Sequence, residues 1–448
     1  KGVDTTKPNL LERRARWNEK TDDELALPTE IWRETVERRE RCKSLRKKIS
    51  SHEINDINDF ITYNLDIRKF AEDLIEKTPS ENFVAQTFDT LQNVTVLDPT
   101  CGSGAFLFAG MNILEPLYER CIDRMEEFNT KNGTFKKELD EIKDKYRSNI
   151  QYFIYKSIIL RNLYGVDIMH EATEIAKLRL FLKMVAVVEV DKRADNLGLD
   201  PLPDIDFNVR CGNTLVGFAN ERELERSFEG DWIEAGKKPE IDAEMADVAK
   251  IYDEFRQIQL DGGDLATFKE SKKTLQTSLK KLNKTLDKKL YATNGMGKPF
   301  DEWKHDAQPF HWLSEFYQII HGNGGFDVII GNPPYVAKTK INYIKDEETF
   351  KCSDLYGYVI RRTIDLLQNN GMHGFIVMHN LAFSRDFLDI RKLLIKNSFP
   401  IWLSFYSRIP AGLFSGNARV RNAIYIMQKK CSVQQKIYTT RMHRWFDE

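Results

Sequence analysis

Short apolar runs alternate with longer amphipathic stretches through most of this chain. Apolar, β-branched runs between turn residues predict buried strands, and apolar positions three and four residues apart predict helices. The runs that fit strands are 94–97, 163–166, 207–210, 326–330, 374–378, 403–406 and 423–427. The stretches that fit helices include 66–76, 170–188 and 355–368. Strands that alternate with helices predict an α/β fold with a doubly wound, mostly parallel sheet.

Two segments depart from this alternation. Residues 1–60 are rich in charged, helix-forming residues and predict a helical N-terminal segment. Residues 219–325 predict a helical insertion, either solvated or a basic arm that contacts nucleic acid. Within it five leucines keep helical spacing and indicate a two-helix hairpin: Leu275, Leu279, Leu282, Leu286 and Leu290. The insertion would separate two halves of one core, 61–218 and 326–430, and 431–448 would begin a C-terminal region.

Composition narrows the class of protein. The 448 residues are 41% hydrophobic, enough for one large or two to three ordinary domains. No apolar run approaches the roughly 20 residues of a membrane span, and the first 25 residues do not resemble a signal peptide. Six cysteines without a CxxC pair argue against a zinc site or a disulfide framework and fit a reducing cytoplasm. Because the chain opens on Lys1, we expect a piece of a larger protein.

Charge is unevenly distributed. The net charge is −1, which argues against a simple basic nucleic-acid binder. From Arg385 to the end, however, twelve lysines and arginines face four acidic residues, a net of +8. Such a basic region is compatible with contacts to a phosphate backbone, and equally with a solvated charged surface.

Two motifs follow the first two predicted strands. Asp98–Phe106 joins a strand to a helix through two glycines, which allow a backbone to approach a ligand closely. It is neither GxGxxG, because position 107 is Leu, nor a P-loop, because no GK[ST] follows. The second motif is Gly165–Ile168. Its Asp167 ends a strand, where a carboxylate can accept both hydroxyls of a ribose, although acids are common at such positions.

Two further motifs follow later strands. Cys211–Leu215 contains Asn213, whose amide suits the edge of an adenine ring, although an ordinary Gly-Asn turn is the simpler interpretation. Asn332–Tyr335 places two prolines after a strand and so predicts a rigid, extended turn. Such a turn can hold an amide and carbonyls that accept two N–H bonds from an amine, or it can simply close the strand.

Taken together, the strings DPTCGSGAF, GVDI, CGNTL and FDVIIGNPPY resemble the gamma-class adenine-specific (N6) DNA methyltransferases. Ser353–Tyr356, Gly371–His379 and Leu413–Ser415 resemble later motifs of that group. The insertion ending in Pro309–Trp312 resembles the large type IIG restriction-modification and phage-defence enzymes. The resemblance covers roughly 61–430 and implies a seven-stranded class I methyltransferase sheet. No nuclease pattern is visible, and we expect this piece to lack the target-recognition domain that would follow the last motif.

The resemblance implies S-adenosylmethionine as the cofactor, double-stranded DNA as the partner, no metal, and a prokaryotic cytoplasm. Asp167 would hold the ribose, Ile168 would pack on the cofactor's adenine and Asn213 would bind its edge, while Asn332 would border the cofactor. The first loop would hold the methionine portion through Asp98, Pro99, Thr100, Cys101, Gly102, Ser103 and Gly104.

The resemblance also implies direct methyl transfer to a flipped adenine. The Asn332 side chain and the Pro333 carbonyl would accept the two amine N–H groups on a turn stiffened by Pro334. Tyr335 would stack on the base, and Phe414 would close the pocket from the other side. Two alternatives remain open: a methyltransferase for another amine (cytosine, RNA or glutamine), and a DNA-binding or cofactor-sensing subunit of a defence complex with other subunits.

Overall fold

The computed structural model describes residues 6, 9, 12, 15–27, 30–146, 149–188, 203–229, 236, 238–261, 265–294, 297–341, 343, 350–409, 412–414, 420–430 and 436–443. The chain divides into two compact units, residues 1–71 and 72–448.

The first unit is helical, as predicted. It contains α2 (Trp32–Ser50), α3 (Ile57–Tyr63) and the start of α4 (Ile67–Lys77). The Asp56 side chain caps α3 by accepting a hydrogen bond from the Asn58 N–H at 2.8 Å. The Arg38 guanidinium binds the Glu30 carboxylate and lowers its pKa to about 2. Local capping and ion pairing therefore stabilise this unit.

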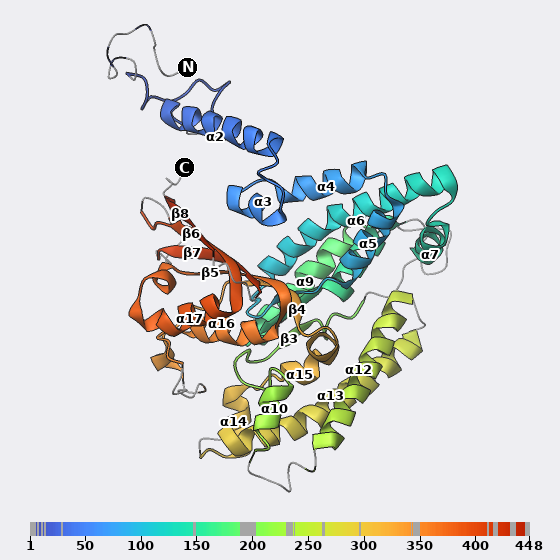
Figure 1. Cartoon of the computed structure of the whole chain (residues 1–448). Helices are drawn as coiled ribbons and strands as arrows, with labels where there is room; N and C mark the ends of the chain where they lie inside the picture. Colours follow the sequence, from blue (N-terminus) through green and yellow to red (C-terminus); the bar gives the residue numbers. More distant parts are fainter. Residues whose placement is uncertain are drawn as a thin grey trace. The chain divides into compact units, whose positions relative to one another are not determined.

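The described residues of the second unit form a single eight-stranded sheet (Figure 1). Its strands lie in the order β3-β2-β1-β4-β5-β7-β6-β8, and only β7 runs antiparallel to its neighbours. The bounds are β1 (Val96–Asp98), β2 (Leu163–Asp167), β3 (Val209–Cys211), β4 (Phe326–Gly331), β5 (Leu367–Met378), β6 (Ser398–Tyr406), β7 (Asn422–Lys429) and β8 (Ile437–His443). The predicted doubly wound, mostly parallel sheet is confirmed.

Helices cover both faces of this sheet (Figure 1). Val96 and Leu163 point into one core, whereas their neighbours Leu97 and Tyr164 point into the other, as expected for strands buried on both sides. The first core contains residues of α5 (Glu81–Asn93), α6 (Ala105–Asn132), α7 (Lys136–Tyr146), α8 (Ile150–Ser157) and α9 (His170–Val185). The second contains residues of α15 (Trp312–Glu315), α16 (Leu355–Leu366) and α17 (Leu388–Asn397).

Short 3-10 and π-helical turns connect several of these elements. They are η1 (Ile158–Asn162), η3 (Gln318–Gly322), η4 (Lys338–Lys340), η5 (His379–Ala382) and η6 (Arg385–Phe387).

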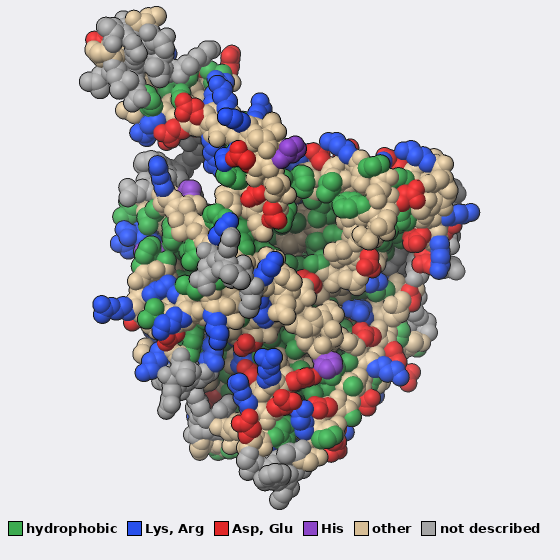
Figure 2. All heavy atoms as spheres, viewed as in Figure 1, with side chains coloured by type: hydrophobic (Ala, Val, Ile, Leu, Met, Phe, Trp, Pro, Cys, Tyr) green, Lys and Arg blue, Asp and Glu red, His purple; other side chains and the backbone are tan. Residues whose placement is uncertain are grey.

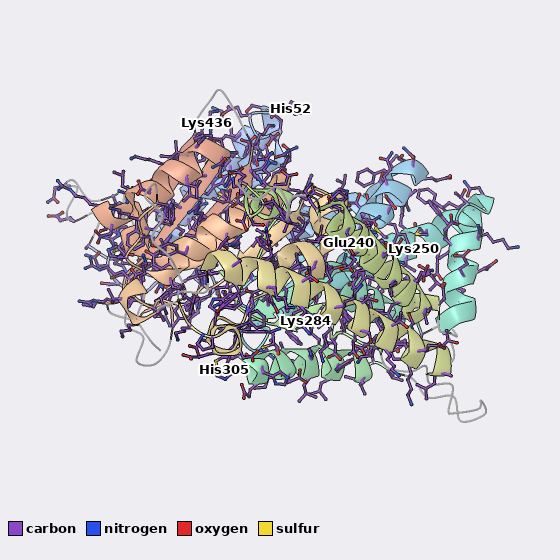
Figure 3. The ribbon with its side chains drawn as sticks, turned by 90° about the horizontal axis from the view of Figure 1, so that it is seen from below. His52, Glu240, Lys250, Lys284, His305 and Lys436 are labelled. Atoms are coloured by element: carbon purple, nitrogen blue, oxygen red, sulfur yellow. The ribbon has the colours of Figure 1, made fainter. Side chains whose placement is uncertain are left out.

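The insertion between β3 and β4 is helical, as predicted. It contains α10 (Glu221–Arg226), α12 (Lys238–Asp261), α13 (Leu265–Asn294) and α14 (Phe300–Ala307). All five leucines of the predicted hairpin are buried in its own core. Figure 3 shows Glu240, Lys250 and Lys284 on α12 and α13, and all three side chains are exposed. Buried Asp287 of α13 joins His311 and Lys304, which ties the hairpin to the chain that leads into β4.

The sheet differs from the prediction in its number of strands and in where some strands begin. The eighth strand, β8, pairs with β6, and we expected seven strands. Because most residues of β8 are exposed, it lacks the apolar run that marks the other strands. β5 begins seven residues earlier than predicted, and its register with β4 shifts between Phe326 and Val328. Ser415 and residues 431–435 and 444–448 lie outside the described residues.

Candidate active site

The predicted motifs meet at one edge of the sheet. Parallel strands end at the same edge, and the order β3-β2-β1-β4 makes their last residues neighbours. β1 ends at Asp98, β2 at Asp167, β3 at Cys211 and β4 at Gly331. The first loop therefore lies between the acid of β2 on one side and the Asn-Pro-Pro-Tyr turn on the other.

Backbone contacts shape the loop after β1. The Gly102 N–H donates to Asp167 Oδ2 at 2.8 Å, and the Gly104 N–H donates to the Cys101 carbonyl at 2.8 Å. Gly102 and Gly104 both have positive φ, at +51° and +78°. A Cβ on Gly104 would lie 2.9 Å from the Cβ of Ala176, so glycine allows α6 to pack on α9.

Asp98 links the first loop to the Asn332–Tyr335 turn, which is the predicted catalytic turn. Its carboxylate is buried and accepts a hydrogen bond from the Thr100 N–H at 3.1 Å. A Cβ on Gly331 would lie 2.8 Å from Asp98 Oδ1, so the two strand ends are in close contact. Burial, with a smaller effect from the nearby Asp167 carboxylate, raises the pKa of Asp98 to about 8. A positively charged ligand at this edge would favour the ionised form.

Several groups at this edge fit a bound nucleoside derivative. Asp167 accepts N–H bonds from Gly102 and Met169, one on each oxygen, and each oxygen keeps a lone pair for a hydroxyl. Ile168 is 39% exposed, as a side chain that packs on a ring would need to be. Apart from the chain neighbours of Gly102, no described residue has a heavy atom within 4 Å of a Cβ placed there. The buried Thr100 hydroxyl has no hydrogen-bond partner among the described residues.

The other predicted residues of the first loop have structural contacts. The Pro99 carbonyl accepts a hydrogen bond from the Thr214 hydroxyl. Cys101 is buried, and its N–H donates to the Val166 carbonyl at 3.0 Å. The Ser103 carbonyl accepts from Arg179 Nη1 at 3.0 Å. These bonds fix the loop to β2, α9 and the chain after β3.

Asn213 is buried and already engaged. Its Nδ2 donates to the Ala307 carbonyl at 3.0 Å, and its Oδ1 accepts from the Leu215 N–H at 3.1 Å. The side chain therefore ties the loop after β3 to the end of α14. The side chain also hydrogen-bonds the Tyr343 hydroxyl. Its role at an adenine edge stays a prediction.

The predicted catalytic turn contains a hydrogen-bond chain. Tyr335 Oη lies 2.8 Å from Asn332 Oδ1 and 3.2 Å from the Ile376 carbonyl, and its single proton can be donated to either. Asn422 Nδ2 donates to the same Tyr335 oxygen at 3.1 Å. Burial raises the pKa of Tyr335 to about 12, so the hydroxyl keeps its proton at neutral pH. The turn thus holds the Asn332 amide through Tyr335.

The remaining predicted residues vary in exposure. Pro333 is buried, Pro334 is exposed, and Tyr335 is half-buried with Tyr356 edge-on to it at 6.2 Å. Phe414 is half-buried, and its place over a base stays a prediction.

The sequence pattern did not identify Asn422. It precedes the last predicted strand, where a polar residue is ordinary. Because β7 is antiparallel, Asn422 starts at the edge where β5 and β6 end, opposite Met378 and Tyr406. The antiparallel direction of β7, which the sequence pattern did not predict, brings Asn422 to the Tyr335 hydroxyl.

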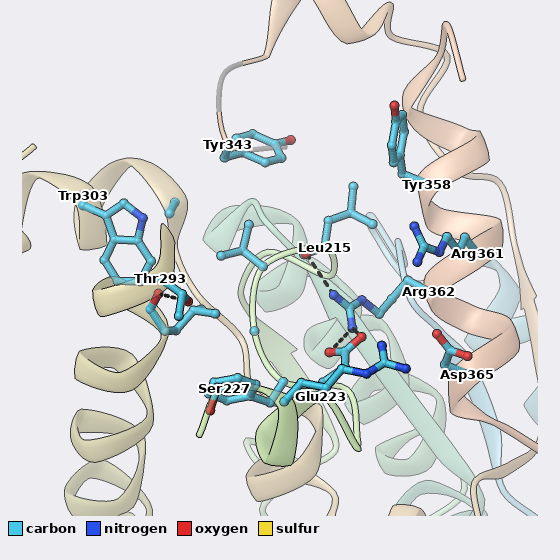
Figure 4. Close-up of a pocket in the computed structure, with 16 residues that line it drawn as sticks. Leu215, Glu223, Ser227, Thr293, Trp303, Tyr343, Tyr358, Arg361, Arg362 and Asp365 are labelled. Atoms are coloured by element: carbon cyan, nitrogen blue, oxygen red, sulfur yellow. Dashed lines mark hydrogen bonds and ion pairs between the residues drawn. The ribbon is translucent and has the colours of Figure 1, made fainter. Parts of the chain in front are cut away.

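A large cavity lies elsewhere in the second unit (Figure 4). It has a volume of about 540 Å³ between the helical insertion and α16. Of the four sequence motifs, only Cys211–Leu215 reaches it, through Leu215. Arg362 crosses it to bind Glu223. The predicted cofactor and catalytic residues do not line this cavity.

No helix within the described ranges is both long and apolar enough to cross a membrane.

Comparison with known proteins identifies the family. The sequence model of the Eco57I restriction-modification methylase family matches residues 161–408, more than half of the chain. That of the MmeI DNA-methyltransferase domain matches residues 74–218.

Individual relatives are much longer than this chain. A putative type II restriction enzyme and methyltransferase of Methanocaldococcus jannaschii is 31% identical over 437 residues, 87% of this chain and 34% of the relative. The adenine-specific methyltransferase BrxX of Escherichia coli is 20% identical over 336 residues, 72% of this chain and 24% of the relative. The chain thus spans about a third or less of these relatives.

Among solved structures, the type IIL restriction-modification enzyme MmeI in complex with DNA is 14% identical, with a TM-score of 0.40, and the match covers 84% of this chain and 37% of that one. The predicted resemblance to restriction-modification methyltransferases is confirmed by the sequence models: the chain belongs to the Eco57I restriction-modification methylase family.

Proposed function

We propose that this chain methylates the exocyclic amine of adenine in DNA with S-adenosylmethionine, within a restriction-modification or phage-defence system. The observation that carries the proposal is the contact between two strand ends. Asp98, at the start of the loop after β1, lies against Gly331, the residue before Asn332. A donor held on the first loop would therefore lie next to the Asn-Pro-Pro-Tyr turn.

The chain offers suitable groups for the cofactor. S-adenosylmethionine supplies an electrophilic methyl group on a positively charged sulfonium. Asp98 and Asp167 would provide the negative charge at that edge, with Asp167 turned to the ribose hydroxyls. Thr100 and the open space at Gly102 would receive the methionine portion. Ile168 would pack on the adenine ring, and Asn213 would bind the edge of that ring.

The catalytic turn suits an amine acceptor. The adenine amine is a poor nucleophile, because its lone pair is delocalised into the ring. Asn332 Oδ1 has two lone pairs, and the Tyr335 hydroxyl can use one of them. The other, with the Pro333 carbonyl, would accept the two amine N–H bonds and favour a pyramidal nitrogen. Positioning and electrostatics then supply most of the rate, with no covalent enzyme intermediate.

The base would have to leave the duplex to reach this turn. That costs a few kcal/mol of stacking. The half-buried Tyr335 ring, held at its hydroxyl end, would recover about 1–3 kcal/mol by stacking on the base. Phe414 would close the pocket from the other side. The name of the relative BrxX, an adenine-specific methyltransferase, supports adenine as the acceptor.

Two variants test these assignments separately. Asn332→Ala should abolish methyl transfer to DNA while cofactor affinity stays within about tenfold, or 1.4 kcal/mol. Asp167→Ala should weaken cofactor binding by more than about 1 kcal/mol, because it removes a hydrogen-bonded carboxylate. Calorimetric cofactor titration and labelled methyl transfer measure the two effects. Wild-type turnover by Asn332→Ala, or unchanged cofactor affinity in Asp167→Ala, would remove that residue from its role.

A further inference from the structure

Phe383, in the loop after β5, is a large aromatic residue left 65% exposed. The loop around it is tightly held. The Phe383 and Ser384 N–H groups donate to the Asn380 carbonyl at 3.1 and 2.9 Å. Arg391 Nη1 donates to the Leu381 and Ser384 carbonyls at 2.8 and 2.7 Å. Burying the ring by moving the loop would break these bonds, so the ring is held where it is exposed.

Neighbouring rings also fix the orientation of Phe383. Its ring lies 5.5 Å from that of Phe405 at the end of β6 and 5.8 Å from that of His379 at the end of β5. These contacts hold the side chain, and more than half of its surface stays open to solvent. An exposed aromatic ring on a rigid support is suited to stacking on a flat partner, because little side-chain entropy is lost on contact.

The same loop is connected to the catalytic turn. Asn380 Oδ1 accepts a hydrogen bond from the Tyr356 hydroxyl at 2.7 Å, and the Tyr356 ring is edge-on to Tyr335. The His379 N–H donates to the Arg421 carbonyl at 3.0 Å, directly before Asn422, which binds Tyr335. Phe383 therefore lies at the same sheet edge as the proposed methyl-transfer turn. Tyr356 and the start of β7 contact both the turn and the loop that carries Phe383.

The surroundings of Phe383 in the sequence and at this edge are basic. Arg385, Arg408 and Arg421 are all exposed, and one exposed acid, Asp386, accompanies them. Figure 2 shows Lys and Arg side chains beside hydrophobic ones on the face over α16, α17 and the strands β5–β8. Positive charge around an exposed aromatic ring matches nucleic acid, which combines phosphates with flat bases.

We propose that Phe383 stacks on a base of duplex DNA next to the flipped adenine, while the surrounding arginines bind the phosphates. This inference rests on the proposed function. When a base leaves the duplex, the neighbouring bases lose their stacking contact with it. An aromatic side chain can replace that contact in any sequence, because every base has a π face.

Binding of a mixed-sequence fluorescent duplex with A·C mismatches, whose adenines leave the stack readily, provides the test. Phe383→Ala should weaken duplex binding roughly tenfold, because stacking contributes about 1–3 kcal/mol per base. Phe383→Trp should bind like the wild type, because it keeps an aromatic ring. The duplex affinity of Phe383→Leu should lie between those of the wild type and Phe383→Ala, since leucine keeps the packing on Phe405 but has no π face. The matched control is Leu182→Ala on α9, which removes a 60% exposed side chain and should change nothing.

Each outcome is decisive. Equal binding by Phe383→Ala and the wild type overturns the inference, as does an equal loss in Leu182→Ala. If Phe383→Ala changes the oligomeric state but not the DNA affinity, the ring belongs to a contact between copies of the chain. That result would also overturn the inference. Binding needs no turnover: a wild type that binds duplex in a Phe383-dependent way but transfers no methyl group refutes the proposed function alone. A wild type that does not bind duplex overturns both.

Discussion

Replacing Tyr335 by phenylalanine isolates the hydrogen-bond chain behind Asn332. The change keeps the ring that would stack on the target base and removes only the hydroxyl. That hydroxyl lies 2.8 Å from Asn332 Oδ1 and accepts from Asn422 Nδ2 at 3.1 Å. We therefore expect two losses, one in the positioning of the Asn332 amide and one in stability.

The structure allows a magnitude. Losing the hydrogen bond to Asn332 costs about 1 kcal/mol. Asn422 is 1% exposed, and its Oδ1 already lacks a partner among the described residues. Leaving its Nδ2 unpaired as well costs about 1–3 kcal/mol. The free energy of unfolding of Tyr335→Phe should therefore fall by about 2–4 kcal/mol. In an Asn422→Ala background the unpaired amide is gone, and the same change should cost about 1 kcal/mol.

Urea unfolding and single-turnover methyl transfer measure the two effects. We expect kcat of Tyr335→Phe to fall about tenfold, equivalent to 1.4 kcal/mol, with DNA affinity unchanged. The control is Tyr118→Phe in α6, away from the turn. It removes a buried hydroxyl that is bonded to the Leu91 carbonyl and to Asn162 Oδ1. It should lose stability without losing kcat. Additive stability losses of Tyr335→Phe and Asn422→Ala, or equal kcat losses in both tyrosine variants, would refute the reasoning.

Two further predictions concern the loop after β1. Asp98 keeps a proton in the native state up to about pH 8, whereas the unfolded chain loses it near pH 4. Stability of the cofactor-free protein should therefore fall as pH rises between these values, and affinity for a cationic cofactor should rise. Urea unfolding and calorimetric titration at several pH values should show that both the unfolding free energy and the cofactor affinity of Asp98→Asn depend less on pH than those of the wild type. An unchanged pH dependence would contradict the raised pKa of Asp98. Gly104→Ala should destabilise by about 2–4 kcal/mol, since left-handed strain adds to a clash with Ala176. Gly133 has a similar φ, and no described residue beyond its chain neighbours lies within 4 Å of a Cβ placed there. Gly133→Ala should therefore lose only about 1 kcal/mol of unfolding free energy in the same urea assay. Equal losses in the two variants would exclude the clash with Ala176.

The sequence was sufficient to predict the sheet and the edge where the motifs meet. Buried strands contain short runs without charged residues, such as 163–166. The rule that parallel strands end at one edge then brings Asp98, Asp167 and Gly331 together. The buried leucines of the insertion were equally readable, because helical spacing records which face of a helix is covered.

Contacts between distant residues could not be predicted in this way. Asn422 and Tyr335 are 87 residues apart, and their hydrogen bond depends on the antiparallel direction of β7, which no local pattern encodes. The bond from Asn213 to the Ala307 carbonyl depends on how the insertion folds back. β8 was missed because an exposed edge strand lacks an apolar run.

The most direct measurement is the identity of the methylated nucleoside. The chain is incubated with unmethylated DNA and S-adenosylmethionine carrying an isotopically labelled methyl group. The DNA is then digested and its nucleosides are identified by mass spectrometry. We predict label in N6-methyladenine, and none in the Asn332→Ala reaction. Label in a methylated cytosine instead of adenine, or unlabelled DNA after incubation with the wild-type chain, would contradict the proposed function.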